Sequence, residues 1–132
     1  MNNLEWSSTY ETGIGKIDNQ HKNFLEIITT IQKVEKENSD VKKVMRTINE
    51  LVKYAQYHFL SEENFMEEIN YPEFQLHKQL HYKLIELLNI EKNNLELNQI
   101  SLSHFLDFAV NWFKNHTVNE DKKIAEFFRA QI

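Results

Sequence analysis

Residues 41–69 of the chain read VKKVMRTINELVKYAQYHFLSEENFMEEI, and the spacing of apolar residues in this stretch decides the fold class. Its inward positions are Val41, Val44, Ile48, Leu51, Ala55, His58, Glu62, Phe65 and Ile69. Steps that alternate between three and four residues are typical of the seam of a left-handed antiparallel helix bundle. His58 and Glu62 occupy positions of this seam where apolar residues are expected.

The same spacing predicts three further long helices. One begins at Asp18, a good N-cap residue, and ends in the polar residues 37–40, which also cap the helix that follows. Another has Pro72 in its first turn, where the missing N–H costs nothing. The predicted inward faces comprise Phe24, Ile28, Ile31 and Val34 in the first helix, Phe74, His77, His81, Leu84 and Leu88 in the third, and Leu102, Phe105, Ala109, Trp112 and His116 in the fourth.

Shorter segments flank these helices. Residues 1–17, which contain both glycines, are predicted to form an irregular arm. A short last helix is expected to be capped by Asn119 and anchored by Ile124, Phe127 and Phe128. The expected fold is therefore all-α: an up-down-up-down antiparallel four-helix bundle with an N-terminal arm and a short C-terminal helix, in a single domain over residues 1–132.

The composition narrows the class of protein. A chain of 132 residues with only 2 Gly and 1 Pro has few of the turn residues that sheets need. The absence of Cys excludes disulfides, thiolate metal sites and Cys nucleophiles. A net charge of −5 does not have the electrostatic signature of nucleic-acid binding. No apolar run approaches the roughly 18 residues of a membrane span and no signal segment opens the chain, so we expect a cytoplasmic protein without nucleic-acid or membrane partners.

Ionisable residues on the inward faces gather at one end of the predicted bundle. In an antiparallel bundle, the starts of the first and third helices lie level with the ends of the second and fourth. The residues that meet there are His21, His58, Glu62, His77, His81, His116 and Asp121. Unrelated core histidines would not alternate between early and late positions, and burying so many ionisable groups is costly unless they pair or bind metal. We therefore interpret this group as a metal centre.

Asp121 can join this centre only if the helix is interrupted. On a continuous α-helix it would point about 140° away from His116, since each residue turns about 100°. We therefore expect residues 117–119 to break the helix, so that Asp121 returns from the first turn of the last helix. His104 lies about 120° from His116 around the fourth helix and is expected outside the centre.

The types of ligand point to two irons. Five histidines and two carboxylates exceed the three or four protein ligands of a zinc ion, and calcium and magnesium prefer oxygen ligands. Lys78 stands where the zinc-protease motif H-E-x-x-H requires Glu, and no histidine here follows Glu by three residues as in ferritin-like di-iron proteins. If both carboxylates and a solvent oxygen bridge two irons, the iron with three histidines is saturated. The iron with two histidines then has one vacancy for a small ligand.

Several motifs follow one another along nearly the whole chain: Trp6-x-x-x-Tyr10-x-x-Gly13-Ile14, Ile17-Asp18-x-x-His21, His58-Phe59-x-x-Glu62-Glu63, His77-x-x-x-His81, and Trp112-x-x-x-His116 with Asp121-Lys122. In these motifs the chain resembles bacterial hemerythrins, which are non-haem di-iron oxygen-binding proteins. The resemblance implies two iron ions (Fe²⁺/Fe³⁺) joined by an oxo or hydroxo bridge, with dioxygen as the ligand. It also implies three sets of protein ligands: His77, His81 and His116 on the saturated iron, His21 and His58 on the iron with the vacancy, and Glu62 and Asp121 as bridges.

Aromatic residues within a turn of these ligands are expected to wall the open position, besides their ordinary role in core packing: Phe24, Phe59, Trp112 and Phe113. The family usually has Leu where Phe113 stands and an aliphatic residue where Thr117 stands. We expect the larger aromatic ring to restrict entry and the hydroxyl to admit water. Glu63 is expected either at the surface or behind the ligands.

These features predict a protein that is not an enzyme and that binds dioxygen reversibly, for storage or for delivery to oxygen-requiring enzymes. The alternative is a di-iron stress protein or enzyme that scavenges oxygen, peroxide or nitric oxide, or that protects iron–sulfur enzymes. A sensor would need an output domain as well. The sequence identifies no protein partner, and we expect a monomer.

Overall fold

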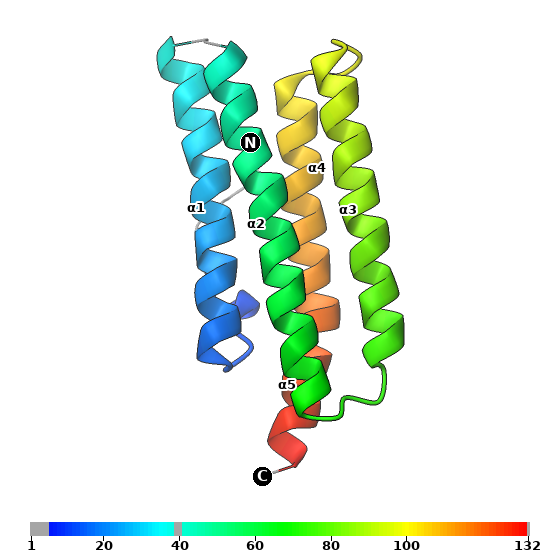
Figure 1. Ribbon diagram of the computed structural model, residues 1–132. Coiled ribbons are helices and arrows are strands. Elements are labelled where there is room, and N and C mark those ends of the chain that lie inside the picture. Colours follow the sequence, from blue (N-terminus) through cyan, green and yellow to red (C-terminus); the bar gives the residue numbers. More distant parts are fainter. Residues whose placement is uncertain (1–5, 39–40, 132) are drawn as a thin grey trace.

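The computed structural model describes residues 6–38 and 41–131, and it forms a bundle of four long helices followed by a short fifth (Figure 1). The elements are a 3₁₀ turn η1 (Ser8–Tyr10), the helices α1 (Gly15–Asn38), α2 (Val41–Glu68), α3 (Phe74–Glu96) and α4 (Leu102–Asn115), a π-helical segment η2 (His116–Asp121), and α5 (Lys122–Ala130). α2 packs against α1 and α3, and α4 packs against the same two helices. The predicted all-α bundle is confirmed, and the described residues contain no strand.

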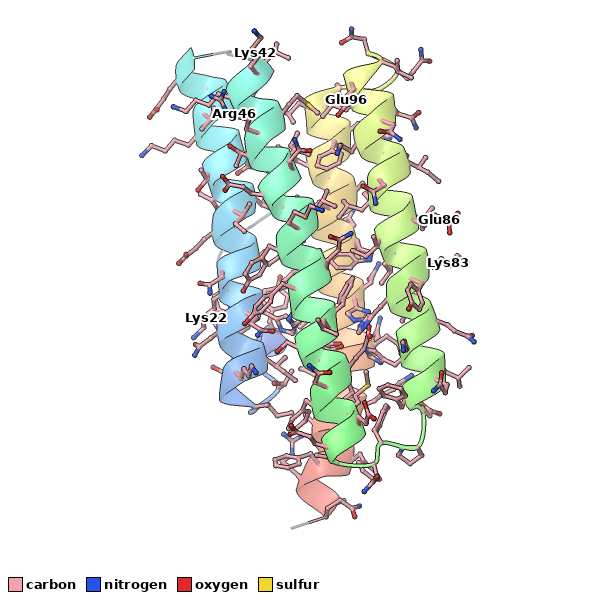
Figure 2. The ribbon with its side chains drawn as sticks, in the orientation of Figure 1. Lys22, Lys42, Arg46, Lys83, Glu86 and Glu96 are labelled. Atoms are coloured by element: carbon pink, nitrogen blue, oxygen red, sulfur yellow. The ribbon has the colours of Figure 1, made fainter. Side chains whose placement is uncertain are left out.

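The apolar core is built largely from the predicted inward faces. Its buried members include Phe24, Ile28, Ile31, Val44, Ile48, Leu51, Ala55, Leu88, Phe105 and Ala109. The prediction is wrong for Val41, which is 72% exposed because it lies in the first turn of α2, where the bundle ends. Charged side chains such as Lys22, Lys83 and Glu86 project outward from the bundle (Figure 2). Among the described residues, no helix is both long and apolar enough to cross a lipid bilayer.

A polar layer interrupts this core near one end of the bundle. Along the inward face of α2, the buried residues change from Ala55 to His58 and Glu62, and then back to Met66. Met66 packs with Ile124 of α5 in a second, smaller apolar cluster. The ionisable residues are therefore enclosed by apolar packing on both sides along the bundle axis.

Asp18 is not the N-cap of the first helix, because α1 begins one turn earlier, at Gly15. Its carboxylate instead accepts hydrogen bonds from the Thr12 N–H at 2.9 Å, the Thr12 hydroxyl at 2.8 Å and the Gly13 N–H at 3.1 Å. Gly13 has φ +86°, a conformation that favours glycine. The Thr12 carbonyl in turn accepts a 2.8 Å hydrogen bond from Arg129 Nη1 of α5. These bonds fasten the arm to the end of the bundle that holds the polar layer.

Asparagines take the place of glycine at two helix ends. Asn70 and Asn98 have φ values of 56° and 58°, in the left-handed region. After Asn70, the Tyr71 N–H bonds to the Met66 carbonyl at 2.9 Å, which is the closing bond of a Schellman motif. Asparagine tolerates this conformation better than most residues do, so the chain reverses direction with few glycines.

Two other predicted helix boundaries need comment. Pro72 precedes α3 instead of lying in its first turn, since the Phe74 N–H bonds to the Tyr71 carbonyl at 3.2 Å and places Pro72 second in a tight turn. The polar residues 37–40 were predicted to end the first helix and cap the next. α1 does end at Asn38, but residues 39–40 lie outside the described part of the chain.

Candidate metal centre

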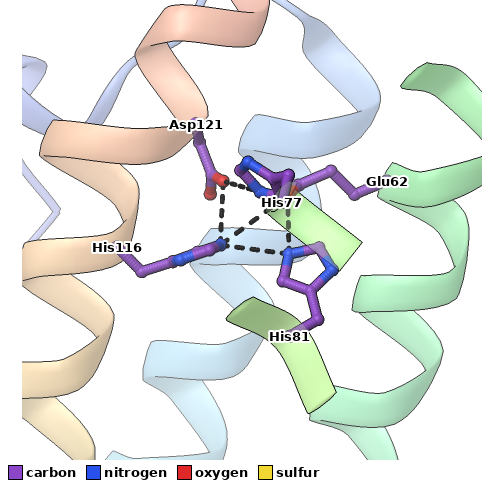
Figure 3. A group of neighbouring side chains, drawn as sticks. All are labelled: Glu62, His77, His81, His116 and Asp121. Atoms are coloured by element: carbon purple, nitrogen blue, oxygen red, sulfur yellow. Dashed lines mark hydrogen bonds and ion pairs between the residues drawn. The ribbon is translucent and has the colours of Figure 1, made fainter. Parts of the chain in front are cut away.

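The polar layer contains all seven ionisable residues that the sequence singled out. Their sources are α1 for His21, α2 for His58 and Glu62, α3 for His77 and His81, and the π-helical segment η2 for His116 and Asp121. All are buried, and Glu62 and Asp121 have no exposed surface. They form two overlapping metal-binding groups: Glu62, His77, His81, His116 and Asp121 in one (Figure 3), and His21, His58, Glu62 and Asp121 in the other. The two carboxylates belong to both groups.

Glu62 directs its two oxygens to different groups of histidines. Oε1 lies 2.7 Å from His77 Nε2 and 3.0 Å from His81 Nε2. Oε2 lies 3.5 Å from His58 Nε2 on the same helix. One carboxylate therefore spans the space between the three-histidine group and the two-histidine group.

Asp121 repeats this arrangement from the opposite side of the centre. Its Oδ1 lies 3.0 Å from His116 Nε2 and 3.4 Å from His77 Nε2. Its Oδ2 lies 2.9 Å from His21 Nε2. Each carboxylate thus has one oxygen toward each group, which is the geometry that a bridging ligand requires.

The interruption predicted at residues 117–119 is not a break. Residues 116–121 continue α4 as a π-helix with right-handed helical dihedrals at both flanking residues, and Asn119 does not cap α5. A π-helix closes its hydrogen bonds over five residues instead of four, so each turn holds more residues. The wider turn returns Asp121 to the face of His116, which an α-helix would not do.

Two histidines are oriented by residues behind them. His58 Nδ1 lies 2.6 Å from Gln20 Oε1, and His81 Nδ1 lies 2.8 Å from Glu63 Oε2. A ring whose Nδ1–H donates outward presents its Nε2 lone pair to the centre. Glu63 therefore lies behind a ligand candidate, which decides between the two positions that the sequence left open. Gln20 was missed, because it precedes His21 by one residue and gives no periodic signal on the inward face.

A small cavity of about 10 Å³ lies beside His21 and His58. A cavity of this volume accommodates about one water-sized molecule. Its walls include the four aromatic residues singled out in the sequence, Phe24, Phe59, Trp112 and Phe113, together with Ala55 and Thr117. Phe113 is covered from the arm by Tyr10, with ring centroids 5.5 Å apart. The structure thus places a mostly apolar space against His21 and His58 of the two-histidine group, and His116 of the three-histidine group also lines it.

His104 lies outside the centre. Its side chain is 61% exposed, and its Nε2 lies 3.4 Å from Glu91 Oε2 of α3. This position agrees with its angle of about 120° from His116 around α4.

Residues 12–128, which include all seven buried ionisable residues, match the family described as the Hemerythrin HHE cation binding domain. The chain belongs to the hemerythrin family. A bacteriohemerythrin of Clostridium acetobutylicum is 33% identical over 124 residues, which are 89% of this chain and 95% of the relative. A bacteriohemerythrin of Pseudomonas aeruginosa PAO1 is 31% identical over 134 residues, covering 100% of this chain and 86% of the relative.

Solved hemerythrin structures share the fold. A wild-type hemerythrin crystal structure superposes with a TM-score of 0.81 at 22% identity, over 92% of this chain and 95% of that chain. A hemerythrin point mutant superposes with a TM-score of 0.83, also at 22% identity, over 96% of this chain and 98% of that chain. At these identities the likeness concerns the arrangement of the helices alone.

The charges of this hemerythrin-family centre depend on competition between burial and ion pairing. Burial alone would lower the pKa values of His77 and His116, but Asp121 and Glu62 outweigh it and raise them to about 9 and about 10. Burial and the nearby Glu62 would raise the pKa of Asp121, yet its contacts with His116 and His21 hold that pKa well below the usual range. Burial likewise opposes ionisation of Glu62, and hydrogen bonds from the surrounding histidines lower its pKa well below normal. Both carboxylates are therefore anionic near neutral pH.

The buried polar atoms fit a pair of cations. Within the described residues, Glu62 Oε2 and both Asp121 oxygens are buried without an aligned hydrogen bond, despite their short contacts with histidines. Facing imidazoles also approach closely, since His21 Nε2 lies 3.1 Å from His58 Nε2. Buried anions without such bonds are costly, and a positive ion in each group would offset this cost. Nitrogen from imidazole combined with carboxylate oxygen suits iron and other transition metals.

Proposed function

We propose that this chain is a single hemerythrin-like di-iron domain over residues 1–132 that binds dioxygen reversibly, for storage or delivery. The observation that carries the proposal is the division of the centre into groups of three and two histidines that share both carboxylates. A pair of metal ions with unequal numbers of protein ligands follows from this division. Membership of the hemerythrin family supports iron as the metal.

The proposed ligand roles follow the two groups: His77, His81 and His116 hold one iron, His21 and His58 hold the other, and Glu62 and Asp121 bridge them together with an oxo or hydroxo group. When bound, the reduced iron pair supplies the electrons for reversible oxygen binding. With one histidine fewer, the second group leaves room for an external ligand, and this group adjoins the 10 Å³ cavity. The cavity volume limits that ligand to a very small molecule.

The side chains that line the cavity favour reversible binding of dioxygen over its enzymatic reduction. Apart from the histidines, its lining within the described part of the chain has no acidic or basic side chain. Phe24, Phe59 and Trp112 instead surround the space with carbon atoms and exclude water. An enzyme that reduces dioxygen needs a positioned general acid, and apart from the histidines these walls supply no side chain of that kind.

One observation favours the alternative function. Thr117 is 1% exposed and lines the same cavity, so the wall of the proposed oxygen site includes a side chain that carries a hydroxyl. A hydroxyl can hold a water molecule there and promote oxidation of the iron pair. Fast oxidation would suit a di-iron stress protein or enzyme that scavenges oxygen, peroxide or nitric oxide, or that protects iron–sulfur enzymes.

A cyclic oxygenation experiment distinguishes these functions. Protein that contains iron is reduced anaerobically, one dioxygen is added per chain, and the visible absorption of the centre is recorded. A carrier develops a band that disappears under vacuum and returns with oxygen over several cycles, without released peroxide. Rapid conversion to the ferric form, with multiple turnovers when reductant is present, would establish the alternative.

A further inference from the structure

The His81 ring lies between the carboxylates of two consecutive residues of α2. Its Nε2 is 3.0 Å from Glu62 Oε1, inside the centre, and its Nδ1 is 2.8 Å from Glu63 Oε2, outside it. Phe59 stacks on the ring with a centroid distance of 3.9 Å and an interplanar angle of 9°. Both nitrogens and one face of this imidazole therefore have contacts that fix its orientation.

The equivalent position behind the two-histidine group is neutral. His58 Nδ1 lies 2.6 Å from the amide oxygen of Gln20, and Gln20 Nε2 donates to Ser61 Oγ at 3.0 Å. The amide is thus held with its oxygen toward His58. The centre has a carboxylate behind the three-histidine group and an amide behind the two-histidine group.

This difference in charge has an electronic consequence. A hydrogen bond from imidazole to a carboxylate is stronger than one to a neutral acceptor, and it makes the other ring nitrogen a better electron donor. A better donor stabilises a ferric ion more than a ferrous ion, since the ferric ion carries more charge. Glu63 therefore favours the ferric state of the iron bound by His81, whereas Gln20 does not favour the ferric state of the iron bound by His58.

We propose that Glu63 is a positioning residue that lowers the reduction potential of the iron bound by His81. This inference rests on the proposed di-iron function. It identifies the iron beside His81 as the one whose oxidised state the protein stabilises. Glu63 is suited to this role because its side chain is 16% exposed and lines a groove of about 290 Å³ between α2 and α3, so it adds charge without full burial.

Potentiometric titration of iron-loaded variants tests the role of Glu63. Glu63→Gln keeps an acceptor oxygen near His81 but removes the charge, and Glu63→Ala removes both. Glu50→Gln removes one charge from an exposed position of α2 and is the matched control. Loss of a residue that hydrogen-bonds a metal ligand typically lowers metal affinity by at least about tenfold. If the affinity of the site for ferric iron falls about tenfold relative to its affinity for ferrous iron, the reduction potential rises by about 59 mV for one electron.

The expected result is a rise in potential in Glu63→Gln, with two irons per chain retained, and a potential in Glu50→Gln equal to that of wild type. Glu63→Ala should raise the potential at least as much, because it also frees the His81 ring. Two irons per chain with unchanged potentials in both Glu63 variants would overturn the role of Glu63 and leave the proposed function intact. Wild-type protein that fails to bind two irons would instead overturn the proposed function and this inference with it.

Discussion

Asp121 Oδ1 lies 3.0 Å from His116 Nε2, although the two residues are five apart in one continuous helical segment. The contact exists because residues 116–121 are π-helical, and the wider turn places both side chains on the inward face. π-helical insertions occur often at functional sites. Here one short segment contributes a histidine to one metal-binding group and a carboxylate to both groups.

Loss of a shared carboxylate should remove both irons. Asp121→Ala deletes oxygens that face both histidine groups, so we expect fewer than one iron per chain after purification, against two in wild type. His21→Ala deletes one nitrogen from one group and should leave about one iron per chain. Elemental analysis of each protein gives these ratios.

His104→Ala is the control for this comparison, since its side chain is exposed and lies outside the centre. It should retain two irons per chain. Retention of two irons in Asp121→Ala, or loss of iron in His104→Ala, would contradict the proposed ligands.

Removal of the metal should destabilise the bundle strongly. Among the described residues, three buried carboxylate oxygens, Oε2 of Glu62 and both oxygens of Asp121, then remain without aligned hydrogen bonds. An ion whose free concentration is about a thousand times its Kd adds about 4 kcal/mol to the free energy of unfolding when it binds one site. Loss of this free energy when the ion is removed corresponds to a decrease in Tm of roughly 10 °C or more in a domain of this size.

Calorimetry of chelator-treated protein measures this decrease. Ferrous iron added anaerobically should restore the original Tm, whereas magnesium should not, because magnesium prefers oxygen ligands. Equal Tm values before and after metal removal would show that no ion contributes to the folded state.

Metal binding should release protons near neutral pH. In the metal-free protein, His77 and His116 have pKa values raised to about 9 and about 10, so both rings are protonated at pH 7. A metal requires the neutral imidazole, so each ring must lose its proton on binding. We therefore expect metal affinity to increase as the pH rises from 6.5 to 7.5, with release of about two protons per chain from this pair.

Anaerobic addition of ferrous iron to weakly buffered protein, monitored with a pH indicator, counts these protons. The same titration of His77→Ala should release fewer protons. An affinity that does not change with pH would contradict the charged state assigned to the two histidines.

Replacement of Thr117 should slow oxidation of the oxygenated protein. Thr117→Val keeps the shape of the side chain but removes the hydroxyl from the cavity wall. If that hydroxyl stabilises a water molecule by about 1 kcal/mol, its loss slows oxidation roughly fivefold. The rate is measured as the decay of the visible absorption in air.

Thr30→Val is the matched control, because Thr30 is an exposed residue of α1 whose hydroxyl bonds to the Glu26 carbonyl at 2.9 Å. It should oxidise at the wild-type rate. Faster oxidation in Thr117→Val would mean that the hydroxyl protects the centre instead of admitting water.

The periodicity of the sequence was sufficient to predict the four long helices and their inward faces. Which face of a helix is apolar depends only on residues three and four positions apart, so the sequence alone places Phe24, Ile48 and Phe105 in the core. The seven ionisable residues could be gathered at one end for the same reason, once the helices were taken as antiparallel. The hemerythrin resemblance relied on this same order and spacing.

Helix boundaries were less predictable, because they depend on hydrogen bonds with residues outside the helix. Asp18 has the character of an N-cap, yet α1 begins at Gly15 and the Asp18 carboxylate binds the arm at Thr12 instead. Likewise, α4 continues into a π-helix where a break at residues 117–119 was predicted. A local sequence signal does not show whether a helix stops or widens when packing requires an extra residue.

The sequence by itself determined the helical bundle and the set of ionisable residues, because both follow from helical periodicity and chain order. Only the tertiary structure decided that each oxygen of Glu62 faces a different histidine group, that Gln20 lies behind His58, and that Glu63 lies behind His81. These contacts join side chains from different helices or depend on rotamers within the packed core. Their geometry is set by how neighbouring helices approach and rotate against one another, a property that no single helix encodes.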